Sequence, residues 1–118
     1  MTPTGRLAAI TVDCHDPHAL AGFWSALLGG QVSEPLPGWR RVGLPDGAPA
    51  LTLQPVPEPK VGKTRIHLDV VVADIEAAVA EITGLGGRWS GERHDYPEGS
   101  VLVMADPEDN EFCLVLED

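Results

Sequence analysis

The same pattern of residues occurs twice in this chain, at a constant spacing of 58 positions. Asp16 and Asp74 have that separation, and each stands between an apolar segment and an amphipathic helical pattern. Gly29 and Gly87, which follow the two helical patterns, are separated by the same distance along the chain. A repeat of this length predicts two copies of one strand–helix–strands unit. We expect the two units to pack about a pseudo-twofold axis and a ligand site to form where their sheets face each other.

The first half of the chain predicts one helix and four strands. Residues 7–14 read as a strand, Asp16 is a suitable helix N-cap, and Pro17 suits the first helical position. The apolar face of the helix consists of Leu20, Phe23, Trp24, Leu27 and Leu28. Gly29 and Gly30 then end the helix. Further strands are expected at residues 31–34, 39–44 and 50–55, the last two as a hairpin.

The second half predicts the same order of elements. Residues 64–73 have the strongest strand pattern in the chain, and Asp74 caps a helix whose inner face holds Ile75, Val79 and Ile82. A short strand is expected around Trp89, whose side chain should lie in the core. Residues 94–96 are expected in a loop, and the final two strands are expected at residues 101–105 and 111–116. We therefore predict one α+β domain over residues 1–118, with module 1 at about 5–56, a proline-rich linker at 57–63 and module 2 at about 64–118.

Charge and cysteine content limit the functions that the chain can have. The formal net charge is −10, which argues against nucleic-acid binding and could attract a cationic ligand, although solubility alone also explains it. The two cysteines are too few for a disulfide framework. The sequence shows neither a charged-then-apolar leader nor a long apolar run. We expect a cytoplasmic protein with no nucleic-acid or membrane partner.

Alternation along the strands predicts a polar group on the sheet faces that the helices leave free. In residues 64–73 the residues expected beneath the helix are Ile66, Leu68, Val70 and Val72. The candidate ligand-binding residues on the opposite face are Thr11, Asp13, Asp69, Glu111 and Cys113. Trp39 and Tyr96 adjoin turns and could stack on a ligand. Such a face is typical of a ligand cleft, although plain solvent exposure is the alternative for Asp13 and Glu111.

His67 is the candidate catalytic residue on that face. Its imidazole could act as an acid or base, while Asp69 orients it or binds a cationic group. The alternative is a structural pair that holds the linker through Lys63 or Arg65. Cys113 could be a nucleophile or, alternatively, a small buried hydrophobic residue.

The repeated βαβββ pattern resembles the vicinal oxygen chelate superfamily, which includes glyoxalase I, extradiol dioxygenases and bleomycin-resistance proteins. The motifs that carry the resemblance are Asp16-Pro17 with Phe23-Trp24 and Leu27-Leu28-Gly29, the crossover and fifth strand from Gln54 to Asp69, and Asp106-Pro107-Glu108-Asp109-Asn110-Glu111-Phe112-Cys113. The resemblance implies two paired modules that form a cupped sheet with the helices outside, often in a homodimer. We expect a homodimer, since Trp24 and the edge strands would leave apolar surface for a second chain.

Metal-dependent members of this superfamily carry one His, Glu or Gln ligand on each of four equivalent strands. Matched residue by residue, those positions hold Ala9, either Ala50 or Leu51, His67 and Cys113. Because Ala and Leu cannot coordinate a metal, we expect no metal and no other cofactor. The first hypothesis is therefore a metal-independent protein that binds a small organic molecule. A lyase or isomerase that uses His67 is the second, and a metal-dependent glyoxalase or dioxygenase is the third.

Overall fold

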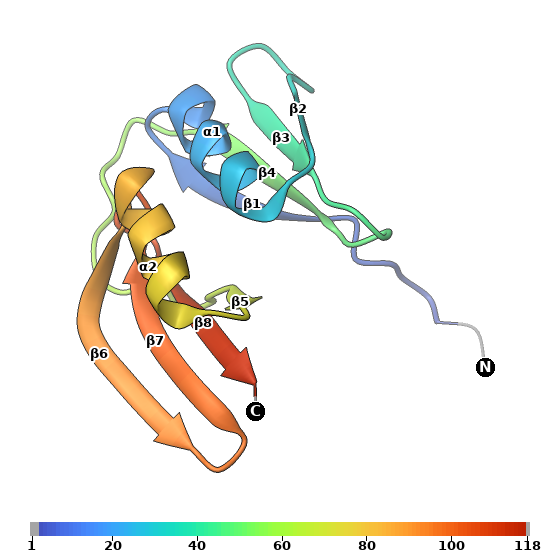
Figure 1. Ribbon diagram of the computed structural model, residues 1–118. Helices are drawn as coiled ribbons and strands as arrows, with labels where there is room; N and C mark the ends of the chain where they lie inside the picture. The colour runs from blue at the N-terminus through green and yellow to red at the C-terminus, as the bar shows by residue number, and fades with distance from the viewer. Residues whose placement is uncertain (1–2, 118) are drawn as a thin grey trace. The chain divides into compact units, whose positions relative to one another are not determined.

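The computed structural model describes residues 3–117 and shows two modules with the same order of elements (Figure 1). Module 1 contains β1 (Ala9–Cys14), α1 (Pro17–Leu28), β2 (Gln31–Ser33), β3 (Arg40–Gly43) and β4 (Ala50–Pro55). Module 2 contains β5 (Asp69–Val71), α2 (Ile75–Gly84), β6 (Arg88–Tyr96), β7 (Gly99–Ala105) and β8 (Glu111–Glu117). The chain divides into two compact units after Pro59, inside the predicted linker.

Each module folds into one four-stranded mixed sheet. The strand order is β1-β4-β3-β2 in module 1 and β5-β8-β7-β6 in module 2, so the two sheets have the same topology. In each sheet the first strand runs parallel to the last, and the other neighbours are antiparallel. The predicted α+β class and the repeated βαβββ unit are therefore confirmed.

Both helices begin where the repeated aspartates predict. The Oδ1 atoms of Asp16 and Asp74 each accept a hydrogen bond of 3.1 Å from a backbone amide in the first helical turn. After α1 the chain passes very close to β3, because a Cβ atom at Gly30 would lie 1.9 Å from the carbonyl oxygen of Gly43. Only glycine fits there, and its φ of 99° is a second reason. Neither of the helices that residues 3–117 form is long and apolar enough to cross a membrane.

Each helix covers one face of its own sheet (Figure 1). In module 1, α1 packs on β3 and β4, where Val42, Leu51 and Leu53 are buried. The buried residues between α2 and the sheet of module 2 include Ala78 and Ile82 on α2 and Leu102, Met104, Phe112 and Leu114 on β7 and β8. Trp24 is only 2% exposed and belongs to the core of module 1, so it cannot supply the apolar surface on which the homodimer expectation partly rests.

Two elements of module 2 differ from the sequence prediction. β5 contains only Asp69–Val71. In the segment before it, the Thr64 amide donates to the Glu111 side chain, and Ile66 is 76% exposed instead of buried. β6 is long and includes residues 94–96, which we predict as a loop. Trp89 is 43% exposed and not in the core. The register of β6 against β7 shifts between Trp89 and Arg93, and such a bulge disguises the alternation that sequence reasoning relies on.

Candidate functional site

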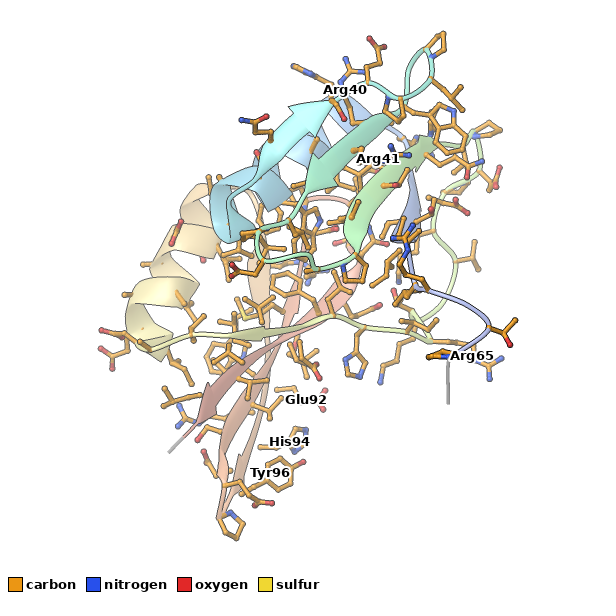
Figure 2. The ribbon with its side chains drawn as sticks, turned by 90° about the vertical axis from the view of Figure 1, so that its right-hand side faces the viewer. Arg40, Arg41, Arg65, Glu92, His94 and Tyr96 are labelled. Carbon is orange, nitrogen blue, oxygen red and sulfur yellow. The ribbon has the colours of Figure 1, made fainter. Side chains whose placement is uncertain are left out.

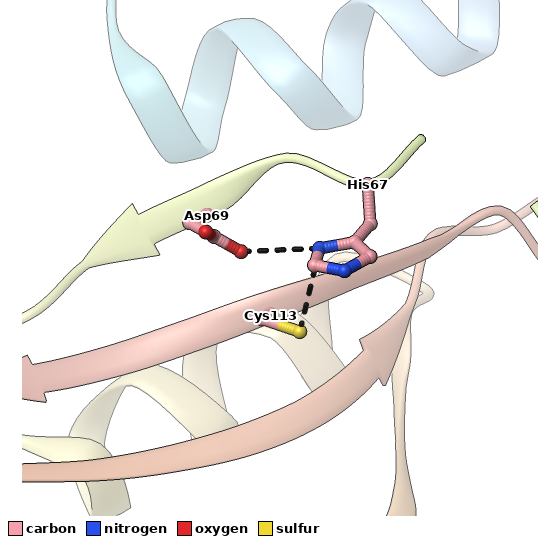
Figure 3. A group of neighbouring side chains, drawn as sticks. All are labelled: His67, Asp69 and Cys113. Atoms are coloured by element: carbon pink, nitrogen blue, oxygen red, sulfur yellow. Dashed lines mark hydrogen bonds and ion pairs between the residues drawn. The ribbon is translucent and has the colours of Figure 1, made fainter. Parts of the chain in front are cut away.

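Three of the predicted site residues, His67, Asp69 and Cys113, come together in module 2 (Figure 3). The Nδ1 atom of His67 lies 3.1 Å from Oδ1 of Asp69 and 3.8 Å from Sγ of Cys113. We call these residues the His67 cluster. They meet because β5 pairs in parallel with β8, in a register that sets Asp69 opposite Cys113. The amide of Cys113 also donates a 2.9 Å hydrogen bond to the carbonyl of Leu68, which holds the end of the linker against β8.

Both neighbours of His67 face the same ring nitrogen, and this decides the chemistry of the cluster. When Asp69 is ionised, Nδ1–H donates to its carboxylate and Nε2 remains available to a ligand. Burial raises the pKa of the Cys113 thiol, and the charges of Asp69 and Glu92 raise it further against the opposing charge of Lys63. Cys113 is therefore a protonated thiol near neutral pH, which does not favour a nucleophilic role.

An apolar surface borders the His67 cluster on the helix-free face of module 2. Four side chains, which we call the valine floor, form it: Val71 on β5, Val101 and Val103 on β7, and Val115 on β8. The strand register places these residues side by side, with Val103 next to Cys113. Val71 is 61% exposed, and the other three valines are half-buried. The valine floor can therefore contact the apolar part of a ligand.

A second polar group borders the valine floor on β6. Figure 2 shows Glu92, His94 and Tyr96 one after another along this strand, and the register pairs His94 with Val101. The Nε2 atom of His94 lies 2.6 Å from Oε2 of Glu92, and its ring stacks on that of Tyr96 with the centroids 6.2 Å apart. The hydrogen bond from His94 lowers the pKa of Glu92, which therefore stays ionised.

The β6 group revises the sequence prediction in two respects. Tyr96, a predicted ligand contact, lies at the end of a strand and not in a loop. Glu92 was absent from the predicted site, although its spacing of two residues from His94 would have placed both on one face had residues 88–96 been recognised as one strand.

Glu111, another predicted ligand-binding residue, anchors the end of the linker. Its Oε2 atom accepts a 2.8 Å hydrogen bond from the Thr64 amide, and its Oε1 atom lies 2.9 Å from Nζ of Lys60. Burial raises the pKa of Glu111, but these hydrogen bonds outweigh that effect and lower the pKa to about 2. The carboxylate therefore stabilises the segment that leads into His67.

The predicted site residues of module 1 lie on or near the helix-free face of its own sheet. Thr11 and Asp13 are exposed residues of β1, and Thr11 pairs with Thr52 of β4. Trp39 is half-buried and directly precedes β3. These three residues belong to a different compact unit from the His67 cluster.

The four-strand ligand set of metal-dependent relatives does not fit this chain. Leu51 is buried with the residues beneath α1, so the alternative that places it at the fourth-strand ligand position is wrong. The neighbouring positions on the helix-free face of β4 are Ala50 and Thr52, and Ala50 pairs with Ala9 of β1. None of these three side chains is a His, Glu or Gln, so the matched ligand positions on β1 and β4 hold no ligand of the kind that the family uses.

Module 2 does offer a group of possible metal donors. Within residues 3–117, one ligand atom each of His67, Asp69 and Cys113 lies within 4.8 Å of the others. The sequence analysis placed these three residues on one face but did not treat them as a set of metal donors, because Asp69 is not among the four positions that the family uses. In the observed arrangement Nδ1 faces Asp69 at hydrogen-bond distance and the thiol is protonated, so a metal would have to displace both protons. We therefore retain the expectation that the site works without a metal.

Comparison with known proteins connects these two modules to a family. A family model described as a glyoxalase-like domain matches residues 9–115. No curated protein matches the chain significantly in sequence.

Solved structures share the fold at low sequence identity. A glyoxalase/bleomycin resistance protein/dioxygenase family enzyme from Burkholderia phytofirmans PsJN superposes with a TM-score of 0.80 at 17% identity, covering 97% of this chain and 100% of that one. A protein described in the same terms from Nocardioides has a TM-score of 0.73 at 17% identity, with 99% and 86% coverage. A superfamily member from Sphaerobacter thermophilus DSM 20745 has a TM-score of 0.70 at 19% identity, with 96% and 98% coverage. At these identities the likeness establishes the fold alone.

Replacing Glu111 with Gln should destabilise the protein by about 1–3 kcal/mol at pH 7, because charge-assisted hydrogen bonds to Thr64 and Lys60 weaken. The folded-state pKa of about 2 lies below the ordinary value of 4.5, so the ionised carboxylate stabilises the fold at higher pH. This contribution is lost as the pH falls from about 5 towards 2, and the difference between wild type and E111Q should shrink over that range. Urea unfolding of both proteins at several pH values measures this difference in the free energy of unfolding.

The matched control for that experiment is Glu98→Gln in the turn between β6 and β7, which removes the same charge from an exposed position. It should change the free energy of unfolding by no more than about 0.5 kcal/mol. Equal stability of wild type and E111Q at pH 7 would contradict the anchoring role of Glu111.

Protein purified without a chelator should contain far less than one equivalent of zinc, nickel, iron or manganese. The reason is that the matched ligand positions on β1 and β4 hold Ala9 and Ala50, while the thiol of the His67 cluster is protonated. Elemental analysis of wild type and His67→Ala measures this. About one metal ion per chain in wild type, lost in His67→Ala, would overturn the expectation and restore the metalloenzyme hypothesis.

Proposed function

This chain belongs to the glyoxalase-like domain family, and on that premise we propose that it binds a small organic molecule on the helix-free face of module 2, without a catalytic metal. The observation that carries the proposal is an apolar valine floor between two polar groups, the His67 cluster and the β6 residues Glu92, His94 and Tyr96. An apolar surface with a few well-placed polar groups is the usual composition of a ligand site. A protein that sequesters its ligand is one concrete form of this function.

The size and charge of this surface favour a flat ligand with a cationic group. β5 and β6 are the two edges of the sheet, three strand spacings or about 14 Å apart, which is wide enough for a molecule with two or three fused rings. The stacked rings of His94 and Tyr96 present flat contact area at one edge. The carboxylates of Asp69 and Glu92 border the surface, and the chain carries a net charge of −10, so a cation is attracted to it.

An enzyme of the lyase or isomerase type is the second candidate, and the geometry of His67 favours it specifically. With Asp69 accepting the hydrogen bond from Nδ1–H, Nε2 is the ring nitrogen left to take a proton from a bound ligand or to return one. Asp69 would then act as a positioning residue, since it fixes the tautomer and the ring orientation of His67. The two candidates differ in whether the bound molecule is released unchanged, which mass spectrometry of the recovered ligand decides.

Replacing His67 with Ala should weaken ligand binding by about tenfold or more and leave stability nearly unchanged. The His67 and Asp69 side chains are 47% and 60% exposed, and an exposed pair of this kind contributes at most about 1 kcal/mol to folding. A thermal-shift screen with matched cationic and neutral aromatic compounds, such as N-methylquinolinium and quinoline, identifies the probe. Titration of wild type and variant with that probe then gives the affinities, and urea unfolding gives the stabilities.

The matched control is His18→Ala, which removes an exposed imidazole from α1 in module 1 and should leave affinity unchanged. A loss of about 1–3 kcal/mol of stability in His67→Ala with unchanged affinity would support the structural alternative and contradict the proposal.

A further inference from the structure

Module 1 carries a row of hydrogen-bonding side chains that the proposed function does not use. On the helix-free face of its sheet, Thr11 of β1 pairs with Thr52 of β4, Thr52 with Arg41 of β3, and Arg41 with Ser33 of β2. Residues paired in this way point to the same face and are near neighbours. Three hydroxyls and one guanidinium therefore lie in a line across all four strands, and we call them the Arg41 row.

Thr52 is the first sign that the Arg41 row is built for a ligand. The residue is 4% exposed, and its Oγ1 atom has no hydrogen-bond partner among the residues that the structure describes. A buried hydroxyl without a partner is destabilising and is rare in folded proteins. A ligand at this face, or a water that it holds, would supply the missing hydrogen bond.

Arg41 is the second sign that the Arg41 row is built for a ligand, because within the described part of the chain its side chain lacks the ion pair that the neighbouring Arg40 makes. The guanidinium of Arg40 points to the other side of β3 and lies 3.0 Å from the carboxylate of Glu34, which also accepts from the Gly38 amide. Arg41 is exposed and makes no ion pair or hydrogen bond with its side chain within residues 3–117, although the chain has 18 acidic residues. Both arginines are labelled in Figure 2.

We propose that the Arg41 row binds a compact anionic group, a carboxylate or a phosphate monoester, of a small molecule. A guanidinium offers two parallel N–H donors that match either group, and hydroxyl donors on both sides complete its hydrogen bonds. Asp13 lies on the same face, two residues or about 7 Å further along β1, which disfavours a ligand with several negative charges. All residues of the Arg41 row lie in module 1, whereas the residues of the proposed site lie in module 2.

The test is an NMR titration of isotope-labelled full-length protein with three probes of one shape: benzoate, phenyl phosphate and neutral benzamide. One or both anions should shift the backbone amides of Ser33, Arg41 and Thr52, and benzamide should not. Comparison of the two anions identifies whether the site prefers a carboxylate or a phosphate. Arg41→Gln should weaken anion binding at least about tenfold.

One matched control keeps the result specific. Arg40→Gln removes the same charge from the adjacent residue and should bind the anions as wild type does. No response to either anion, equal responses to benzoate and benzamide, or equal losses in Arg41→Gln and Arg40→Gln would each overturn the proposal. Ligand binding at the His67 cluster is tested separately, by titration of His67→Ala with the cationic probe.

Discussion

The structure depends on the packing of one helix against one face of each four-stranded sheet. Burial of alternate strand residues beneath α1 and α2 stabilises each module, at a scale of about 1.5–3 kcal/mol for each fully buried large apolar side chain. Because strand side chains alternate, the same constraint decides which residues remain on the opposite face. Leu102, Met104, Phe112 and Leu114 are buried, and Val101, Val103, Cys113 and Val115 are therefore presented on the helix-free face.

The parallel pairing of the first and last strands of each module gives this free face its chemistry. In module 2 it brings His67 and Asp69 beside Cys113, which is far from both of them in the sequence. The electrostatic consequences follow from position alone: the imidazole is oriented by Asp69, and the thiol, buried near two carboxylates, stays protonated. The equivalent pairing in module 1 sets Thr11 against Thr52, so two modules of one topology present different chemistry.

The sequence was sufficient to predict features that depend on local chemistry and on the repeat. Asp16 and Asp74 cap the two helices as expected, and the order of strands and helices follows the pattern. The match to the glyoxalase-like family model confirms the family resemblance from which the fold was predicted. His67 and Asp69 were expected on one face, and Nδ1 of His67 lies 3.1 Å from Oδ1 of Asp69.

Features that depend on long-range register could not be predicted in the same way. Spacing alone left Ala50 and Leu51 as alternatives, and only the pairing of β4 with its neighbours shows that Thr52 lies opposite Thr11. The bulge in β6 concealed a strand that holds Glu92 and Tyr96 on one face. Glu111 looked like a free carboxylate, and its anchoring role becomes visible only when the linker is folded against β8.

The most direct measurement of the central claim is a map of backbone amide chemical shifts during titration with the ligand that the screen identifies. The account predicts perturbations at Asp69–Val71, at residues 92–96 and at the amides of Val101, Val103 and Val115, all on the helix-free side of module 2. Perturbations confined to Ile75–Gly84, or to module 1, would contradict it.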